Sequence, residues 1–106
     1  MKIAALNDRF RQGDPLVPGV RCQTSGVTAL PEETQRAAVQ RLVSFNAFNP
    51  GDDPYGEHDF GAFEVAGVGR FFFKIDYYAD QRLEEGVESP EPGCYRCLLL
   101  MRAEEY

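Results

Sequence analysis

Two stretches of alternating aromatic and aliphatic residues, with a short glycine-containing break between them, most constrain the fold of this chain. Residues 61–65 and 71–78 each alternate with period two, and Gly67 and Gly69 lie between them. A period of two places successive side chains on opposite faces of a strand, and glycine permits a tight reversal. The pattern predicts an antiparallel β-hairpin. On the second face of the strand predicted over residues 71–78, Phe72 and Tyr78 flank Lys74, so we expect both faces of this strand to be partly covered.

Two amphipathic helices are predicted before the hairpin. The first covers residues 2–12, and the second runs from residue 31 to about residue 46. Proline suits the first turn of a helix, where its missing N–H has no intrahelical partner to lose, and the two carboxylates that follow Pro31 complement the positive end of the helix dipole. At helical spacing, the apolar faces consist of Ile3, Leu6 and Phe10 in the first helix and of Val39, Leu42, Val43 and Phe45 in the second.

Two further strands complete the predicted sheet. An edge strand is expected near residues 20–24, and the run Leu98-Leu99-Leu100-Met101 predicts a central strand over residues 95–102 with burial on both sides. Residues 49–54 and 79–93 are loops by composition. Residues 1–106 therefore predict one α+β domain, with a three- to four-stranded antiparallel sheet and two helices packed on one face.

Charge is distributed unevenly along the chain. Residues 1–50 hold four acidic and six basic residues, whereas residues 51–106 hold thirteen acidic and five basic residues, within a total net charge of −6. Affinity for nucleic acid depends on Lys and Arg that displace counterions, so direct nucleic-acid binding is not expected, and the run Phe71-Phe72-Phe73 is better read as core than as a base-stacking platform. The same field attracts a basic protein surface, although acidity for solubility alone is the other explanation.

The cellular location is inferred from the termini and the cysteines. No apolar run is long enough to span a bilayer, and charged residues interrupt the N-terminal segment before a secretory signal forms. The cysteine count is three, an odd number that does not fit a disulfide framework. We expect a cytoplasmic protein with thiol cysteines and no membrane partner.

His58, the only histidine, follows an acidic loop and is flanked by Glu57 and Asp59. A histidine beside a carboxylate can act as a general base or a metal ligand. Neighbours on an extended chain point to opposite faces, however, so the three side chains cannot converge. The favoured interpretation is that His58 is a hydrogen-bonded anchor at the entry to the hairpin and that Asp59 caps loop N–H groups.

The segment from Cys94 to Cys97 has a spacing that zinc sites use. Zinc needs such a pair on a tight turn, because residues three apart in a strand face opposite sides. Cys22 and His58 would complete a Cys3His set with Cys94 and Cys97, but the leucines that follow are typical of core. Buried structural thiols are the favoured interpretation.

Five motifs carry a resemblance that spans nearly the whole chain. They are Asn7-Asp8-x-Phe10, the step from Gly26-Val27 to Leu30-Pro31-Glu32, Asp53-x-x-Gly56-Glu57-His58-Asp59-Phe60-Gly61-x-Phe63, Phe72-x-Lys74-Ile75-Asp76-Tyr77-Tyr78, and Glu105-Tyr106. On these motifs the chain resembles a small bacterial family known only as a domain of unknown function. The resemblance implies a compact stand-alone protein, often carried on plasmids or other mobile DNA, with no established activity and no catalytic residues to carry over. The chain departs from it at Cys94 to Cys97, where ordinary strand residues are expected.

The function expected from these observations is binding to another protein rather than catalysis. By analogy with small acidic proteins of mobile DNA, the specific candidate is an inhibitor of the anti-CRISPR or antirestriction type that occupies a basic surface of a nucleic-acid-binding effector; a toxin–antitoxin or regulatory partner is a related candidate. The alternative is a small metal-binding protein or metal-dependent hydrolase centred on His58. No cofactor is expected, and the oligomeric state stays open. The residues expected to contact the partner are Asp52, Asp53, Glu57, Asp59, Asp80, Glu84, Glu85 and Glu88.

Overall fold

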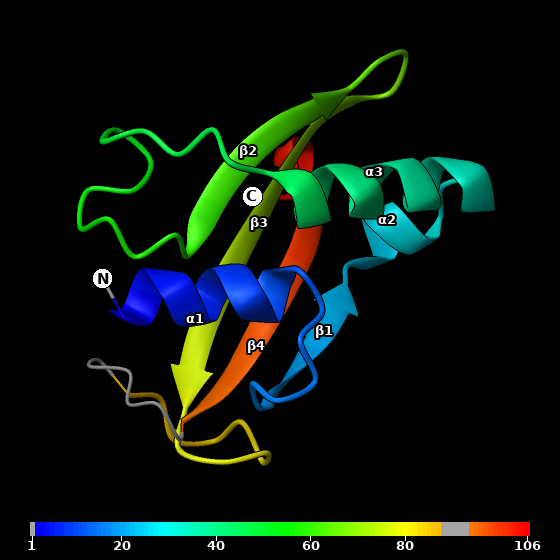
Figure 1. The fold of residues 1–106 in the computed structure, drawn as a ribbon. Coiled ribbons are helices and arrows are strands. Elements are labelled where there is room, and N and C mark those ends of the chain that lie inside the picture. The colour runs from blue at the N-terminus through cyan, green and yellow to red at the C-terminus, as the bar shows by residue number, and fades with distance from the viewer. Residues whose placement is uncertain (1, 88–93) are drawn as a thin grey trace.

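The computed structural model describes residues 2–87 and 94–106, which form an α+β fold, as the sequence predicts (Figure 1). These residues form three helices, the four strands of one sheet and a short C-terminal 3-10 turn. In order, the elements are α1 (Lys2–Arg11), β1 (Gly19–Gln23), α2 (Ser25–Thr28), α3 (Glu32–Ser44), β2 (Phe60–Val65), β3 (Gly69–Tyr78), β4 (Tyr95–Arg102) and η1 (Ala103–Glu105). No helix in the described part of the chain is long and apolar enough to cross a bilayer.

The strands follow the order β1-β4-β3-β2. The predicted hairpin is confirmed, because β2 and β3 are antiparallel, with Phe60 opposite Lys74 and Val65 opposite Gly69. Strand β4 lies inside the sheet, antiparallel to β3, as its leucine run predicts. The sheet differs from the prediction at one edge, where β1 runs parallel to β4. The chain between β1 and β4 includes two helices and the hairpin, which gives ample length for a parallel connection, whereas a hairpin turn joins only antiparallel strands.

Alternation along β3 and β4 divides the sheet into two different faces. Phe71, Phe73 and Ile75 of β3 are buried on the face that α1 and α3 cover, together with Leu98 and Leu100 of β4. We call this the inner face. The opposite side, which we call the outer face, carries the alternate residues of the strands, and most of them are only partly buried. The leucine run is therefore buried most fully on one side.

Aromatic rings fill the centre of the inner face. Phe73 is fully buried, and the Phe45 ring lies 5.3 Å from it in an edge-to-face arrangement. Gly61 makes this contact possible, because a Cβ atom there would lie 2.5 Å from the Phe73 ring and 2.7 Å from the Phe45 ring. The predicted apolar stripe of α3 is confirmed at Leu42, which is buried, and at Val39 and Phe45, which pack against the core. It is wrong at Val43, which is 37% exposed, and Ala38 is buried in addition.

The C-terminal end of the chain is fixed to α2 and β4. The carboxylate of Glu105 accepts hydrogen bonds from Thr24 Oγ1 at 2.6 Å, from the Gly26 N–H at 3.0 Å and from the Arg102 N–H at 2.8 Å. These bonds lower the pKa of Glu105, the Thr24 bond most. Two of the motifs that carry the family resemblance, at Gly26 and Glu105, are therefore in direct contact.

Phe73→Ala should lower the free energy of unfolding by about 3 to 5 kcal/mol, because it removes a buried ring on which the rings of Phe45 and Phe48 pack edge-on. Chemical denaturation followed by circular dichroism measures the change. Tyr55→Ala is the matched control, since Tyr55 is 86% exposed and its loss should change the value by less than about 0.5 kcal/mol. Equal effects of the two substitutions would contradict the placement of Phe73.

Candidate functional site

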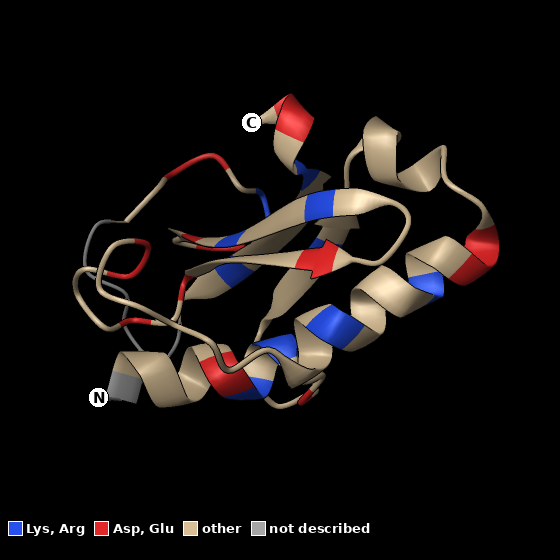
Figure 2. Ribbon diagram, turned by 90° about the horizontal axis from the view of Figure 1, so that it is seen from above, with Lys and Arg blue, Asp and Glu red and all other residues tan. Residues whose placement is uncertain are grey.

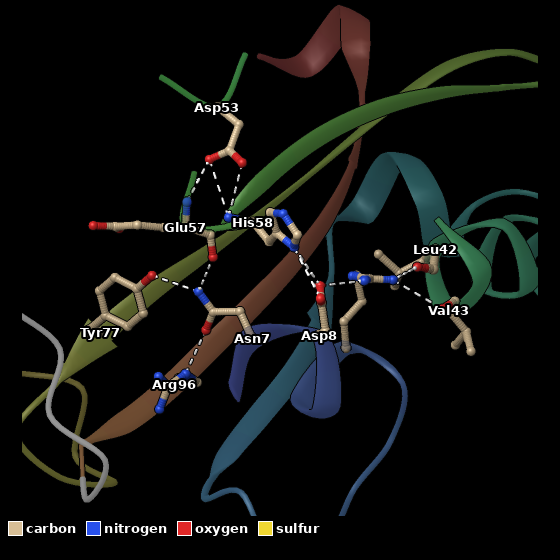
Figure 3. Close-up of polar contacts among 10 residues, drawn as sticks. Asn7, Asp8, Leu42, Val43, Asp53, Glu57, His58, Tyr77 and Arg96 are labelled. Atoms are coloured by element: carbon tan, nitrogen blue, oxygen red, sulfur yellow. Dashed lines mark hydrogen bonds and ion pairs between the residues drawn. The ribbon is translucent and has the colours of Figure 1, made fainter. Parts of the chain in front are cut away.

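His58 joins the loop of residues 46–59 to α1. Its Nδ1 donates to the Asp8 carboxylate, at 2.9 Å from Oδ1 and 3.1 Å from Oδ2 (Figure 3). The imidazole also stacks on Phe48, with 4.0 Å between ring centroids and 3° between ring planes. Residue 58 has a positive φ of 59°, which turns the chain sharply at this point. His58 is thus a hydrogen-bonded anchor where the loop enters β2.

Asp53 holds the turn that precedes His58. Its carboxylate is buried and accepts from the Glu57 N–H at 3.0 Å and from the His58 N–H at 3.2 Å (Figure 3). The predicted capping role of Asp59 is therefore wrong, and Asp53 has that role. The physical reason is position: a short carboxylate caps the turn that follows it, whereas Asp59 already continues the hairpin, and its carbonyl accepts from the Ile75 N–H at 2.8 Å.

Asn7 connects the same loop to two strands. Its Nδ2 donates to the Glu57 carbonyl at 2.9 Å and to the Tyr77 hydroxyl at 2.8 Å, and its Oδ1 accepts from Arg96 Nε at 2.6 Å (Figure 3). Asn7 and Arg96 are both fully buried. Burial raises the pKa of Tyr77 far above its usual value, and the nearby charges of Asp59 and Glu57 raise it further, so this hydroxyl stays protonated.

Asn7 and Arg96 are the site residues that sequence reasoning missed. A signal was present for both: Asn7 lies between Ile3 and Phe10 at helical spacing, and Arg96 alternates with Leu98 along a buried strand. A polar residue at a core position needs a buried partner, and here each is the partner of the other. The guanidinium of Arg96 also lies over the Tyr77 ring, 5.4 Å from its centroid.

Arg11 fixes the end of α3 to α1. Its Nη1 donates to the carbonyls of Leu42 and Val43, both at 3.0 Å, and its Nη2 pairs with Asp8 at 2.8 Å. A cation suits the carbonyls of a helix C-terminus, which have no partners within the helix. Asp8 therefore links α3, through Arg11, to the acidic loop, through His58.

The residues predicted to contact a partner occupy different settings. Figure 2 shows most of the acidic segments, including those of loops 46–59 and 79–87, on one side of the molecule, whereas in Figure 1 the first loop lies beside the start of β2 and the second beyond the end of β3. Both loops contribute to one groove along β3, which Asp59 lines from the first loop and Gly86 and Val87 line from the second. Asp53 is buried in its capping role, and Glu88 lies outside the described residues, as does the rest of segment 88–93 of the predicted charged loop. The others are at least partly exposed, and they are Asp52, Glu57, Asp59, Asp80, Glu84 and Glu85.

Asp59 lies in an unfavourable electrostatic setting. Burial raises the pKa of its carboxyl above the usual range, and the charges of Glu57, Asp53 and Asp76 add to the effect. At the other loop, Arg82 pairs with Asp80 at 3.0 Å and lowers the pKa of that carboxyl. Glu84 and Glu85 are exposed beside this pair.

The four residues of the alternative zinc set do not come together. Cys22 and Cys97 lie near each other on the outer face, whereas His58 contacts α1 and the Cys94 thiol lies 3.6 Å from Arg96 Nη1 in the core. Burial raises the pKa of the Cys97 thiol and the Cys22 thiol raises it further, so Cys97 stays protonated at neutral pH. Within residues 2–87 and 94–106, no three His, Cys, Asp or Glu side chains are placed to hold a metal ion.

The fold and the site define a small α+β protein in which a buried polar cluster holds an acidic loop. The chain belongs to the family described as "Protein of unknown function (DUF3768)", whose model matches residues 23–105. The match begins at the end of β1, so α1, with Asn7 and Asp8, lies before it. No curated protein and no solved structure matches the chain.

Asp59→Asn should raise the melting temperature at pH 7. The folded-state pKa of Asp59 lies above its unfolded value of 3.8. At pH values above both pKa values, the ionised side chain therefore lowers the stability of the fold. This cost disappears as the pH falls below 3.8. The difference in melting temperature between the variant and the unmodified protein should therefore become smaller as the pH is lowered to about 3.

Asp80→Asn is the matched control for this titration, because the pKa of Asp80 is lowered rather than raised. It should leave the melting temperature at pH 7 unchanged or slightly lower. If Asp59→Asn also lowers it at pH 7, the crowding of carboxylates around Asp59 is not the dominant effect.

Proposed function

We propose that this protein is a non-enzymatic binding protein that docks its acidic end onto a basic surface of another protein. The acidic end comprises the exposed and half-exposed carboxylates of loops 46–59 and 79–87, which are Asp52, Glu57, Asp59, Asp80, Glu84 and Glu85. A field of this sign attracts a basic surface and accelerates encounter with it.

The observation that carries the proposal is the crowding of like charges around Asp59. Burial and three neighbouring carboxylates raise the pKa of Asp59, so the ionised group destabilises the fold at neutral pH. The polar cluster nearby uses Asn7, Asp8 and Asp53 to hold the loop, and it needs no charge from Asp59. Residues that lower the stability of a fold and make no structural contribution in return are typical of functional sites.

The specific candidate is an inhibitor that occupies the nucleic-acid-binding surface of an effector protein, of the anti-CRISPR or antirestriction type. Two considerations support it. A cluster of carboxylates carries the same sign of charge as a phosphate backbone, so it can bind in a basic channel that normally holds nucleic acid. The family resemblance implies that such proteins are carried on mobile DNA, where inhibitors of this type are useful. The first consideration comes from the charges of this chain and the second from analogy.

The metal-centred alternative has less support. Asp8 occupies Nδ1 of His58 and Phe48 covers one face of the ring, and the described chain brings no metal-binding set to this position. A hydrolase would need either a metal or a nucleophile within reach of the imidazole. The contacts of His58 instead serve to hold the loop.

Charge reversal tests the proposal directly. Immobilised protein is used to capture partners from the host, and each captured protein is then purified and its affinity measured by calorimetry. Glu57→Lys, Glu84→Lys and Glu85→Lys together should weaken binding by at least about tenfold, and affinity of the unmodified protein should fall as salt rises from roughly 50 to 500 mM, because exposed charges are screened.

The matched control changes the net charge equally but at other places. Glu32→Lys, Glu33→Lys and Glu104→Lys alter exposed carboxylates at the start of α3 and in η1, and this triple variant should retain most of the affinity. Both triple variants should remain folded, since exposed charges contribute little to stability. An equal loss of binding affinity in the two triple variants would show that binding depends on net charge and not on the acidic end.

A further inference from the structure

The outer face of the sheet is an apolar surface that the helices of the inner face leave open. Phe72 and Lys74 of β3 lie on it opposite Met101 and Leu99 of β4, and Phe60 of β2 lies beside Lys74. Except for Met101, which is buried, these residues are only partly buried. Figure 1 shows α1 and α3 on the other side of the sheet. Strands with apolar residues on both faces are typical of sheets covered on both faces.

An aromatic cluster marks one edge of the outer face. The rings of Phe60, Phe72 and Tyr106 have centroids 5.1 to 5.8 Å apart, and the Arg70 guanidinium lies 5.8 Å from the Phe72 ring centroid. Tyr106 is 75% exposed although it contacts the other two rings. Tyrosine and arginine beside packed aromatic rings are the residues that most often dominate protein–protein interfaces.

The charges on the strands of this face are balanced, unlike those of the whole chain. Along the outer side of β3, Lys74 precedes Asp76, with 3.3 Å between Nζ and Oδ2, and both side chains are partly exposed, at 40% and 47%. Glu64 and Arg70 form a second opposite pair across β2 and β3. The strands of the outer face therefore carry two positive and two negative charges, on a chain whose net charge is −6. At the edge of the face, Asp52 adds a negative charge, because it lines a pocket with Phe60, Arg70, Phe72 and Tyr106.

We propose that the outer face binds a second copy of this chain, so that two sheets pack face to face about a two-fold axis. If the axis crosses β3 between Lys74 and Asp76, the two β3 strands run in opposite directions, and each Lys74 faces the Asp76 of the other copy. Phe72 then faces Tyr78 in the same way. A two-fold interface must be self-complementary, and the change of charge sign along β3 meets that requirement.

The charge balance is what favours a second copy over other occupants. Two acidic molecules repel each other, so a face whose strands carry no net charge is the surface on which self-association costs least. A basic partner would be attracted to the acidic end instead, and a nucleic acid would require an excess of positive charge that this face lacks. A sheet of four strands is about 19 Å wide and, along β3, about 33 Å long, which is of the same order as the ~800 Å² per partner of a standard interface.

Paired charge reversals test the geometry. Lys74→Glu alone sets two carboxylates against each other at both symmetry-related positions, and Asp76→Lys alone does the same with two ammonium groups. Each variant should therefore be monomeric, or should dimerise at least about tenfold more weakly than the unmodified protein, by sedimentation velocity at roughly 50 mM salt. An equimolar mixture of the two should restore dimers. In the mixed dimer the carboxylate introduced in one variant faces the ammonium group introduced in the other, and the unchanged Asp76 of the first faces the unchanged Lys74 of the second.

The matched control uses an exposed ion pair away from this face. Arg36 and Glu32 lie one turn apart on α3, at 3.6 Å and with 69% and 86% of their side chains exposed. Arg36→Glu and Glu32→Lys, alone or mixed, should leave the dimer constant of the unmodified protein within about twofold. Circular dichroism is used to check that all four variants are folded.

Three results would overturn the proposal. The unmodified protein could sediment as a monomer at concentrations up to about 500 μM, which would leave the face free for another occupant. It could dimerise with a constant that neither reversal changes, which would place the interface elsewhere. The mixture could fail to restore dimers that both single reversals had abolished, which would exclude the facing of Lys74 with Asp76.

Discussion

The hydrogen bonds and ion pairs of Asn7, which is buried, and Asp8, which is half-buried, are the interactions on which the rest of this structure depends. Asn7 uses its amide to bond a loop carbonyl, a β3 tyrosine and a β4 arginine, and Asp8 pairs with His58 and Arg11. Both residues lie in one turn of α1, so this turn joins the acidic loop, the sheet and the end of α3. Buried polar groups are favourable only when they have partners, which makes such an arrangement specific. Among the described residues of this cluster, Arg11 Nε and Arg96 Nη2 are buried without a hydrogen-bond partner.

The cluster explains how a chain with so many carboxylates can present them in a fixed arrangement. Like charges at residues 57 and 59 repel each other, and a free loop would separate them. Asp53, which caps the turn, and the anchor formed by His58 and Phe48 oppose that separation. A surface that is already ordered before binding avoids the entropy cost of ordering a loop in the complex.

The sequence predicted those parts of the fold that depend on local periodicity. Helices α1 and α3, the hairpin and the position of β4 inside the sheet follow from spacing alone, whereas the short helix α2 was not predicted. The parallel pairing of β1 could not be predicted, because it depends on how the chain returns over the sheet. For the site, the sequence predicted the anchoring role of His58 but not its partner, since Asp8 lies fifty residues earlier. Asp59 was assigned the capping role of Asp53 because neither the turn nor the start of the strand is visible in composition. The long-range bonds of Asn7 and Arg96 likewise require the fold.

Amide hydrogen exchange at Glu57 and His58 tests most directly whether the polar cluster holds the acidic loop. Both N–H groups bond to Asp53, inside the turn that Asn7 and Asp8 fasten to α1. In the unmodified protein they should be protected, and Asp8→Ala should accelerate their exchange by about 10- to 100-fold, the equivalent of roughly 1.4 to 2.7 kcal/mol, while buried amides in the middle of β3 change less. Exchange of Glu57 and His58 at the rate of an unstructured chain in the unmodified protein would contradict the account.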